Sequence, residues 1–437
     1  MSDLLDRIRS RKAIVGIVGQ GYVGLPLALV FNEAGFPVVG LDLDPAKVDA
    51  LNRGESYIKH IGAARVAKAV KTGCFRASTD FDELKTCDAV LICVPTPLGH
   101  HREPDLSFVI DSTRAVAKRL KKGQLVVLES TTYPGTTDED CLPILEATGL
   151  KTPADFLLAF SPEREDPGNP DFHTRTIPKV VGGVNRESTE AAVALYAAAI
   201  DTVVPVSSAR VAESSKLLEN IFRSINIALV NELKMTFDRM GIDIWEVIEA
   251  AKTKPFGFKP FYPGPGLGGH CIPLDPFYLS WKAAEYGIWT RFIELAGEIN
   301  THMPHFVVGK AVAALNEEGK SIKGASVLVL GLSYKEDIDD DRESPSYEII
   351  ELLRERGAKV DYCDPYFPVA RPGRKHDIQL KSIPCTAEAF GAYDAVVLST
   401  GHKQFKEPSL YKNVRLVVDT RNAVRLPDGS KGRLVKA

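Results

Sequence analysis

Residues 13–35 read AIVGIVGQGYVGLPLALVFNEAG, and residues 37–44 read PVVGLDLD. The first stretch begins as a β-branched apolar run, which is typical of a buried strand, and continues with the spacing of a helix. Between the two patterns lie Gly19, Gly21 and Gly24, spaced as G-x-G-x-x-G. The second stretch is again strand-like, so these residues predict a β-α-β unit with a glycine turn after its first strand.

Glycine at these three places has a physical reason. In the dinucleotide-binding pattern the glycines allow a tight turn, let a pyrophosphate approach the backbone, and permit close helix packing, while the helix N-terminus offers free N–H groups. Asp42 ends the second strand at about the distance where an acid binds the ribose 2′-hydroxyl. Its charge would repel a 2′-phosphate, so NAD is expected rather than NADP. Tyr22 and Val23 belong to the same loop and are expected to contact NAD.

Two threonines follow later strands. Thr96 lies in CVPTP and Thr132 in ESTTYPG, and in an open α/β sheet ligands bind at the carboxyl ends of strands. Both are therefore candidates for cofactor contact. Position alone favours an ordinary turn role equally.

The rest of the chain extends the same alternation of strands and helices. Strand-like runs recur up to about residue 205 and again after residue 324, separated by helical segments. Between them ESSKLLENIFRSINIALVNELKMTFDRMG, residues 213–241, predicts one long helix. The expected α/β fold has two Rossmann-like, doubly wound parallel-sheet domains joined by a central helical domain with a long connecting helix. The expected boundaries are residues 1–205, 206–315 and 316–437.

Composition limits the function classes. The 437 residues are 44% hydrophobic and 25% charged with a net charge of -3, which favours a globular protein and no nucleic-acid partner. No apolar run approaches the roughly 18 residues of a membrane span, and MSDLLDRIRSRK lacks the apolar centre of a signal peptide. Seven cysteines without a C-x-x-C pair predict a reducing compartment, the cytoplasm, and no metal site.

Lys216 and Asn220 are the first candidates for chemistry. Four residues apart on the long helix, they project from the same face. A lysine next to an amide can hold an oxygen or share its proton. Such a pair is usually solvated surface, but the flanking Leu217 and Ile221 predict a buried helix face and favour a role.

The segment FYPGPGLGGHCIPLDPFYL, residues 261–279, is the most informative. Its four glycines indicate that something approaches the backbone of a loop that carries Cys271. Asp275 and Pro276 are a strong helix start, and a thiol ahead of a helix N-terminus has a lowered pKa. Composition alone would make Cys271 a buried thiol, and a metal site with His270 lacks further ligands. Glu163, after the strand DFLLAF, is a candidate general base or a surface glutamate.

Taken together, the chain resembles the UDP-glucose/GDP-mannose dehydrogenase family over essentially its whole length. The matching blocks are GQGYVGLPLA, VPTP, ESTTYPGTT, SPERxxPG, KLLENxFRxxNIALVNEL, GPGLGGHCIPLDP and GLSYKEDIDDDRESP. Within the family, YPGTT, SPERxxPG and RESP resemble the branch that acts on UDP-N-acetylhexosamines. One departure is Pro167, where relatives acting on UDP-glucose often carry a second glutamate, so Glu165 does not inherit that role.

The resemblance implies two hydride transfers to NAD that convert a sugar CH2OH to a carboxylate. It implies that Cys271 is the nucleophile, that Lys216 and Asn220 stabilise oxyanions, and that Asp275 is the acid beside the cysteine. It places Thr132 and Glu163 around the reacting C6 and its water. Either Glu163 or Asp275 would activate that water.

For the UDP-sugar substrate the resemblance implies contacts from the C-terminal domain. Lys335 and Arg421 would reach the UDP moiety, and Tyr262 and Gly268 would line its path. UDP-N-acetylglucosamine is the first expectation, with UDP-N-acetylmannosamine second and UDP-glucose third, in surface polysaccharide synthesis. The apolar faces of the long helix exceed what one subunit would cover, so a homo-oligomer is expected.

Three alternatives remain to be weighed. The β-hydroxyacid dehydrogenases also join a Rossmann domain to a helix with a Lys/Asn pair, but they do not require the cysteine loop or the third domain. A short-chain epimerase is suggested by the Y-x-x-x-K spacing of Tyr278 and Lys282, which here follow the cysteine loop instead of a strand. A non-enzymatic NAD-binding protein would not need the reactive groups, all of which are present.

Overall fold

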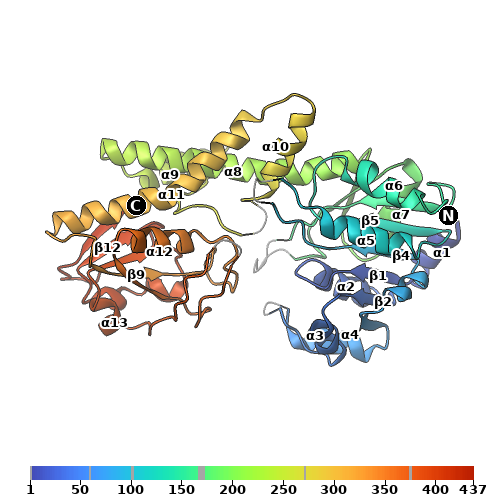
Figure 1. The fold of residues 1–437 in the computed structure, drawn as a ribbon, viewed down its shortest axis with the longest axis horizontal. Coiled ribbons are helices and arrows are strands. Elements are labelled where there is room, and N and C mark those ends of the chain that lie inside the picture. Colours follow the sequence, from blue (N-terminus) through green and yellow to red (C-terminus); the bar gives the residue numbers. More distant parts are fainter. Residues whose placement is uncertain (1, 59–60, 100–102, 166–172, 270–271, 374–375) are drawn as a thin grey trace. The chain divides into compact units, whose positions relative to one another are not determined.

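The computed structural model describes residues 2–58, 61–99, 103–165, 173–269, 272–373 and 376–437. They form two compact units (Figure 1). Unit 1 runs to Glu219 and includes Phe277–Trp289, and unit 2 comprises Asn220–Pro276 and Thr290–Ala437. The division passes through two helices, so the boundaries of the three domains given above stay a prediction.

Unit 1 is built on an eight-stranded sheet of order β3-β2-β1-β4-β5-β6-β7-β8. The reversal of direction after β1 is that of a doubly wound dinucleotide-binding sheet. Its strands are β1 Val15–Val18, β2 Val38–Leu41, β3 Phe75–Ser78, β4 Ala89–Ile92, β5 Gln124–Leu128, β6 Phe156–Phe160, β7 Lys179–Gly183 and β8 Val203–Pro205. Its helices are α1 Ser2–Arg9, α2 Gly24–Glu33, α3 Pro45–Asn52, α4 Ala63–Lys71, α5 Ser107–Ala117, α6 Leu142–Glu146 and α7 Arg186–Ala197, with a 3-10 helix at Phe81–Lys85 and a π-helix at Thr136–Cys141.

The sheet departs from the expected all-parallel arrangement at one place. β7 runs antiparallel to β6, with Phe160 opposite Gly182, while β7 and β8 are parallel to each other. A parallel return requires a crossover, usually a helix, and the described residues between β6 and β7 contain none. The edge strand β3 was not expected either, because its sequence FRAS alternates polar and apolar residues over only four positions.

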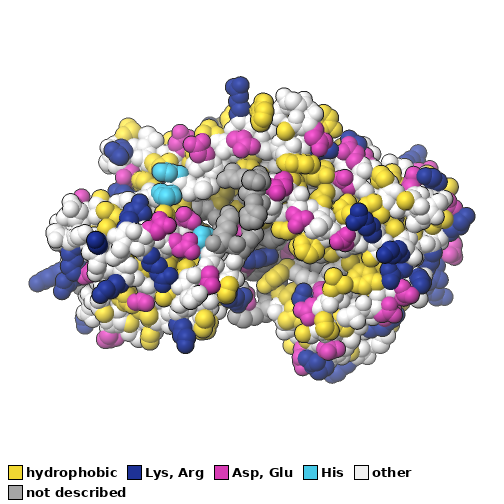
Figure 2. Space-filling model, in the orientation of Figure 1, with side chains coloured by type: hydrophobic (Ala, Val, Ile, Leu, Met, Phe, Trp, Pro, Cys, Tyr) yellow, Lys and Arg dark blue, Asp and Glu magenta, His cyan; other side chains and the backbone are white. Residues whose placement is uncertain are grey.

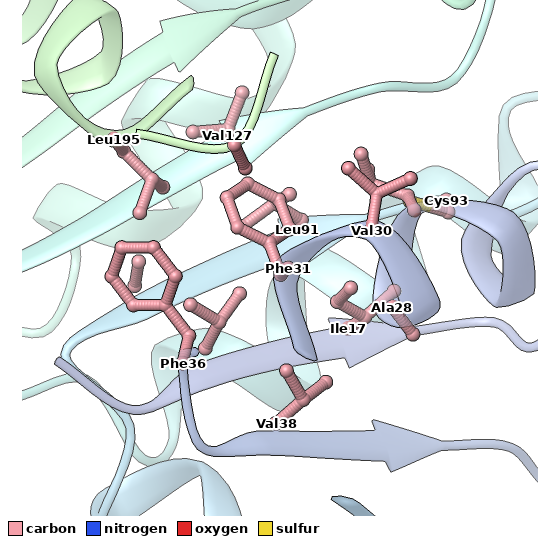
Figure 3. Close-up of a cluster of buried hydrophobic side chains, with 14 of the residues drawn as sticks. Ile17, Ala28, Val30, Phe31, Phe36, Val38, Leu91, Cys93, Val127 and Leu195 are labelled. Atoms are coloured by element: carbon pink, nitrogen blue, oxygen red, sulfur yellow. The ribbon is translucent and has the colours of Figure 1, made fainter. Parts of the chain in front are cut away.

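Alternate residues of the strands enter two cores. Val15, Ile17 and Leu91 pack with α1, α2, α4 and α7 on one face, and Val90, Ile92 and Val126 pack with α5 and α6 on the other. Figure 3 shows the first core, where the side chain of Phe31 on α2 points among strand residues. Helices therefore cover both faces, as the strand spacing requires.

Unit 2 contains a five-stranded parallel sheet of order β10-β9-β11-β12-β13. Val327 and Val329 pack against α11 and α12, and Leu328 and Leu330 pack on the opposite side with α13. Its elements are β9 Ser326–Leu330, α12 Pro345–Glu355, β10 Lys359–Cys363, α13 Ala387–Gly391, β11 Ala395–Leu398, β12 Leu416–Asp419 and β13 Arg433–Lys436, with 3-10 helices at Lys403–Lys406 and Pro408–Tyr411. The short edge strand β13 was not expected.

The connecting helix is α8, Ala209–Met240, which is 32 residues long and carries the end of unit 1 into unit 2. It is followed by α9 Ile244–Lys252, α10 Asp275–Glu285 and α11 Arg291–Glu317. None of the described helices is long and apolar enough to cross a bilayer. Figure 2 shows Lys and Arg side chains mixed with Asp and Glu over the face in view.

Candidate functional site

The turn between β1 and α2 contains three glycines, which differ in the space around them. Gly19 has φ +90, and a Cβ on it would lie 2.7 Å from the carbonyl oxygen of Cys93. A Cβ on Gly24 would lie 1.8 Å from the carbonyl oxygen of Gly19. A Cβ on Gly21, in contrast, would meet nothing within 4 Å. Two glycines thus pack the turn and one leaves open space, as a bound pyrophosphate requires.

Asp42, just after β2, is hydrogen-bonded to the backbone of this turn. Its carboxylate accepts hydrogen bonds from the backbone N–H of Gln20 at 2.9 Å and of Asp44 at 3.0 Å. Lys47 is 3.5 Å away. The side chain of Tyr22 is 40% exposed, and Val23 is the N-cap residue of α2. The residues expected around NAD therefore meet at the carboxyl edge of the sheet.

Thr96 and Thr132 differ in their hydrogen bonds. The Thr96 hydroxyl donates to the carbonyl oxygen of Thr131 at 2.6 Å, so it fixes the two loops to each other. The Thr132 hydroxyl is buried without a hydrogen-bond partner among the described residues. A buried hydroxyl without a partner costs free energy, which makes Thr132 the better candidate for contact with a bound molecule.

A buried carboxylate ties the loop of Thr132 to α8. Glu213 accepts hydrogen bonds from the backbone N–H of Gly135 at 2.7 Å, the backbone N–H of Thr137 at 3.0 Å and the Thr137 hydroxyl at 2.7 Å. Burial raises the pKa of Glu213 to about 7, although these donors oppose the shift. Glu213 lies three residues before Lys216, so one face of α8 carries both side chains.

Glu163 lies in the loop after β6. Its carboxylate accepts hydrogen bonds from the backbone N–H groups of Arg164 at 2.7 Å and Glu165 at 2.6 Å. Its Oε2 lies 3.5 Å from Nζ of Lys179. Burial alone would raise the pKa of Glu163. Lys179, the two N–H groups and Lys216 outweigh burial and lower it, so the group is a carboxylate at neutral pH.

Lys216 and Asn220 are both buried on α8, with exposures of 6% and 0%. The Asn220 side-chain amide donates to Oδ2 of Asp275 at 2.5 Å, and its oxygen accepts a hydrogen bond from Arg223. α10 begins at Asp275 itself. The structure thus brings Asn220 and Asp275 into contact, whereas the sequence predicted a role for each of them without linking the two. Cys271, His270 and Pro167 lie outside the described residues.

The glycine-rich loop is packed too closely for side chains. A Cβ on Gly264 would lie 2.4 Å from Nη1 of Arg421, and one on Gly268 would lie 2.4 Å from Cβ of Tyr334. The backbone N–H of Gly264 donates to Oδ1 of Asn231 at 3.0 Å. The loop is therefore held between α8 and the sheet domain of unit 2.

A pocket of about 450 Å³ lies beside this loop in unit 2. It brings together Tyr262, Lys335 and Arg421, all three expected to line the nucleotide path. Burial lowers the pKa of Arg421 to about 10, so its guanidinium stays charged at neutral pH. The other lining residues are Trp245, Glu249, Pro263, Tyr334, Glu336, Thr400, Gly401, Lys406, Asn422 and Ala423.

Sequence reasoning missed several residues of these sites. Glu129 directly follows β5, so the rule about strand ends would have found it. Lys179 begins a strand and gave no such signal. Trp245 stacks on Tyr262 with ring centroids 5.9 Å apart, but in IDIWEV it has only the appearance of a core residue. Tyr278 and Lys282 do not form a catalytic dyad, since the hydroxyl donates to the Thr96 carbonyl and the ammonium pairs with Glu139 and Glu285.

The chain matches the three domain models of one protein family. These are the UDP-glucose/GDP-mannose dehydrogenase family NAD binding domain over residues 13–200, central domain over residues 210–302 and UDP binding domain over residues 328–426. NAD and a UDP-sugar are thereby the ligands of the two sheet domains.

Individual relatives agree. The chain is 38% identical to the UDP-N-acetyl-D-glucosamine 6-dehydrogenase of Pseudomonas aeruginosa, over 90% of this chain and 91% of that one. It is 35% identical to the UDP-N-acetyl-D-mannosamine dehydrogenase of Pyrococcus horikoshii, over 94% and 96% of the two chains. A solved structure of the UDP-D-ManNAc dehydrogenase from Pyrococcus horikoshii superimposes with a TM-score of 0.88 at 32% identity, covering 97% of this chain and 98% of that one.

Proposed function

Because the chain belongs to the UDP-glucose/GDP-mannose dehydrogenase family, we propose that it is a UDP-N-acetyl-D-glucosamine 6-dehydrogenase. It would oxidise C6 of the sugar to a carboxylate in surface polysaccharide synthesis. The observation that carries the proposal is the pocket of unit 2, where Lys335 and Arg421 face a site within the matched UDP binding domain. The N-acetylglucosamine assignment is supported by relatives of that activity at 38% and 34% identity.

Binding of the cofactor would fall to the turn after β1. Gly21 would leave room for the pyrophosphate, while Gly19 and Gly24 pack the turn, and Asp42 would accept a hydrogen bond from the ribose 2′-hydroxyl. Tyr22, Val23 and Thr96 would complete the contacts. Bound NAD+ supplies the hydride acceptor for each of the two oxidation steps.

Chemistry at C6 would use Lys216 and Asn220 on α8 together with Cys271. In the first oxidation Lys216 and Asn220 would hold the C6 oxygen while C6 loses a hydride, for which bound NAD+ would be the acceptor. The hydroxyl proton would pass to solvent, and an aldehyde results. The Cys271 thiolate adds to this aldehyde, and the same two side chains stabilise the oxyanion of the adduct. After the second oxidation a thioester links Cys271 to the sugar.

Hydrolysis of the thioester completes the reaction. Glu163 is a carboxylate at neutral pH. It takes a proton from water while the water oxygen bonds to the thioester carbon, and the C–S bond then breaks to return the Cys271 thiolate. Asp275 is engaged by Asn220, which favours an orienting role for Asp275 and the base role for Glu163. Thr132, whose hydroxyl has no hydrogen-bond partner among the described residues, would contact the reacting group.

The test is a count of NADH against sugar for three substrates. We expect two NADH and one carboxylate per UDP-N-acetylglucosamine, with slower turnover of UDP-N-acetylmannosamine and UDP-glucose. UDP-N-acetylmannosamine is the second candidate, because two of the relatives with that activity match 94% and 90% of this chain. One NADH per sugar would favour a simple alcohol dehydrogenase, and NAD binding without turnover would favour a non-enzymatic role.

The covalent step has its own test. Cys271→Ser should fail to form carboxylate at the normal rate, and no thioester should form at residue 271 of this variant under turnover, as intact-protein mass spectrometry would show. Carboxylate formation at the wild-type rate by Cys271→Ser would contradict the covalent scheme.

The proposal includes a homo-oligomer. Leu218, Phe222 and Leu229 are 68%, 45% and 52% exposed on α8, and their spacing of four and seven residues places them on one face of the helix. A second copy of the chain would cover this apolar stripe. Light scattering after size-exclusion chromatography should show an oligomer for the wild type and a smaller species for Leu218→Glu with Leu229→Glu.

A further inference from the structure

The reversal of β7 brings the beginning of a strand to the edge of the sheet where the other strands end. Phe160 lies opposite Gly182 in the antiparallel pair, and each step along β6 is matched by a step back along β7. Ser161 continues the contact, since its hydroxyl donates to the carbonyl oxygen of Val180 at 2.8 Å. Two residues further, the same register places Glu163 opposite Lys179.

Lys179 is held between two carboxylates. Its Nζ lies 2.6 Å from Oε2 of Glu129 and 3.5 Å from Oε2 of Glu163. The side chains of Lys179, Glu129 and Glu163 are only 5%, 0% and 14% exposed. One buried cation therefore serves two acids, one at the end of β5 and one after β6.

Glu129 is anchored from the other side. The Tyr196 hydroxyl on α7 donates to Oε1 of Glu129, and the Lys179 ammonium also lies 5.5 Å from the centre of the Tyr196 ring. The position of the ammonium is thus fixed by groups from three elements. A buried charge held in this way stays in place only while its partners remain.

Several charged groups act on Glu163, and Lys179 has the largest favourable effect. Burial would raise the pKa of Glu163, but Lys179, Lys216 and two backbone N–H groups lower it. For Lys179 itself, burial would lower the pKa, and Glu129 and Glu163 raise it. The other titratable groups around Glu163 are Glu165 in its own loop, Glu129 after β5, Cys93 after β4 and Tyr196 on α7.

We infer that Lys179 is a positioning residue of the proposed reaction, which holds Glu163 as the ionised base for thioester hydrolysis while Glu129 and Tyr196 hold Lys179. The inference rests on the proposed function. In the step concerned, Glu163 accepts one proton from water, a C–O bond forms, the C–S bond breaks, and Cys271 leaves as thiolate. Lys179 contacts neither the sugar nor NAD in this scheme.

The experiment uses two variants of the full-length protein that change the acid limb of the kcat profile in opposite directions. Lys179→Met combined with Glu129→Gln removes the cation and one acid together, so the interior keeps its charge balance. We expect the acid limb to move up by at least one pH unit, so that kcat falls about tenfold at a pH below the limb and changes little at pH 7. KM for the UDP-sugar should stay within twofold, because the nucleotide pocket lies in unit 2.

Glu129→Gln alone keeps the cation and removes the acid that competes for it. The acid limb should then move down by about half a pH unit. Because this variant keeps the lysine, it tests the inference even if the double variant does not fold. Glu232→Gln, an exposed position of α8, is the matched control and should leave the profile unchanged.

Slow hydrolysis should also be visible as a covalent intermediate on the protein. At a pH on the acid limb, the sugar thioester on Cys271 should accumulate in the steady state of the double variant and appear in intact-protein mass spectrometry. Lys179→Arg in place of Lys179→Met should restore most of the hydrolysis rate. Acid limbs that coincide for wild type and both variants, without thioester accumulation, would overturn the role of Lys179 and leave the dehydrogenase intact. A wild-type protein that oxidises none of the three UDP-sugars would instead overturn the proposed function.

Discussion

Alanine substitutions of Gly21 and Gly24, the two ends of the G-x-x-G segment, should have different effects on folding stability and on NAD binding. In Gly24→Ala the new Cβ would start 1.8 Å from the Gly19 carbonyl oxygen, and neighbouring backbone would have to move by about 1.2 Å to reach the 3.0 Å below which Cβ contacts essentially do not occur. Overpacking of this kind costs about 1–3 kcal/mol and more when backbone must shift. For a domain of this size, about 3 kcal/mol lowers Tm by about 6–12 °C.

Gly21→Ala should behave in the opposite way. Its Cβ would meet nothing within 4 Å, so the fold should be unchanged or more stable by about 0.4–1 kcal/mol. The methyl group would occupy the space that a pyrophosphate needs. Loss of hydrogen bonds to a charged group costs about 1.5–3 kcal/mol, which corresponds to an increase in Kd for NAD of about 10- to 150-fold.

Calorimetric titration with NAD and thermal unfolding of the same samples measure both quantities. Gly24→Ala should lose both stability and binding, whereas Gly21→Ala should lose binding alone. If Gly21→Ala bound NAD as tightly as the wild type, the turn after β1 would not be the pyrophosphate site.

Three further substitutions test other parts of the site. Glu213→Ala leaves the N–H groups of Gly135 and Thr137 without their acceptor, so unfolding should become easier by about 2–4 kcal/mol, while Glu232→Ala on the same helix should change thermal stability little. Gly264→Ala places a Cβ 2.4 Å from the Arg421 guanidinium. This variant should raise KM for the UDP-sugar about tenfold, or about 1.4 kcal/mol, without changing Kd for NAD. Gly309→Ala, in open space on α11, is the control, and an equal change of KM in both variants would exclude an effect through Arg421. Asn231→Leu removes the acceptor of the Gly264 N–H and the donor to Asn300, and urea denaturation should show a loss of about 2–4 kcal/mol, a result that unchanged stability would contradict.

Much of the fold follows from local sequence because buried parallel strands are continuous apolar runs. β1, β4, β5 and β6 are of this kind, and each is completely buried. β3 and β13 were missed because edge strands of four residues that mix polar and apolar side chains have no such signature. The direction of β7 depends on how the chain returns after β6, and strand periodicity is the same for either direction.

The candidate site was predictable where a residue follows a strand or lies on a helix face. Asp42 and Glu163 follow strands, and Lys216 and Asn220 share a face of α8. The contact between Asn220 and Asp275 joins residues 55 positions apart, and the contact of Gly264 with Arg421 joins two segments of unit 2 that are far apart in sequence. Pairings of this type depend on tertiary packing, and no local spacing encodes them.

The unpartnered hydroxyl of Thr132 separates two properties that mutational screens usually measure together. Valine has nearly the shape of threonine, and at this position it would give up no hydrogen bond within the described part of the chain. A screen that scores only abundance or heat resistance would therefore accept Thr132→Val as neutral. Only a screen that scores turnover would register what the hydroxyl does, so residues of this kind are lost when sites are sought through stability alone.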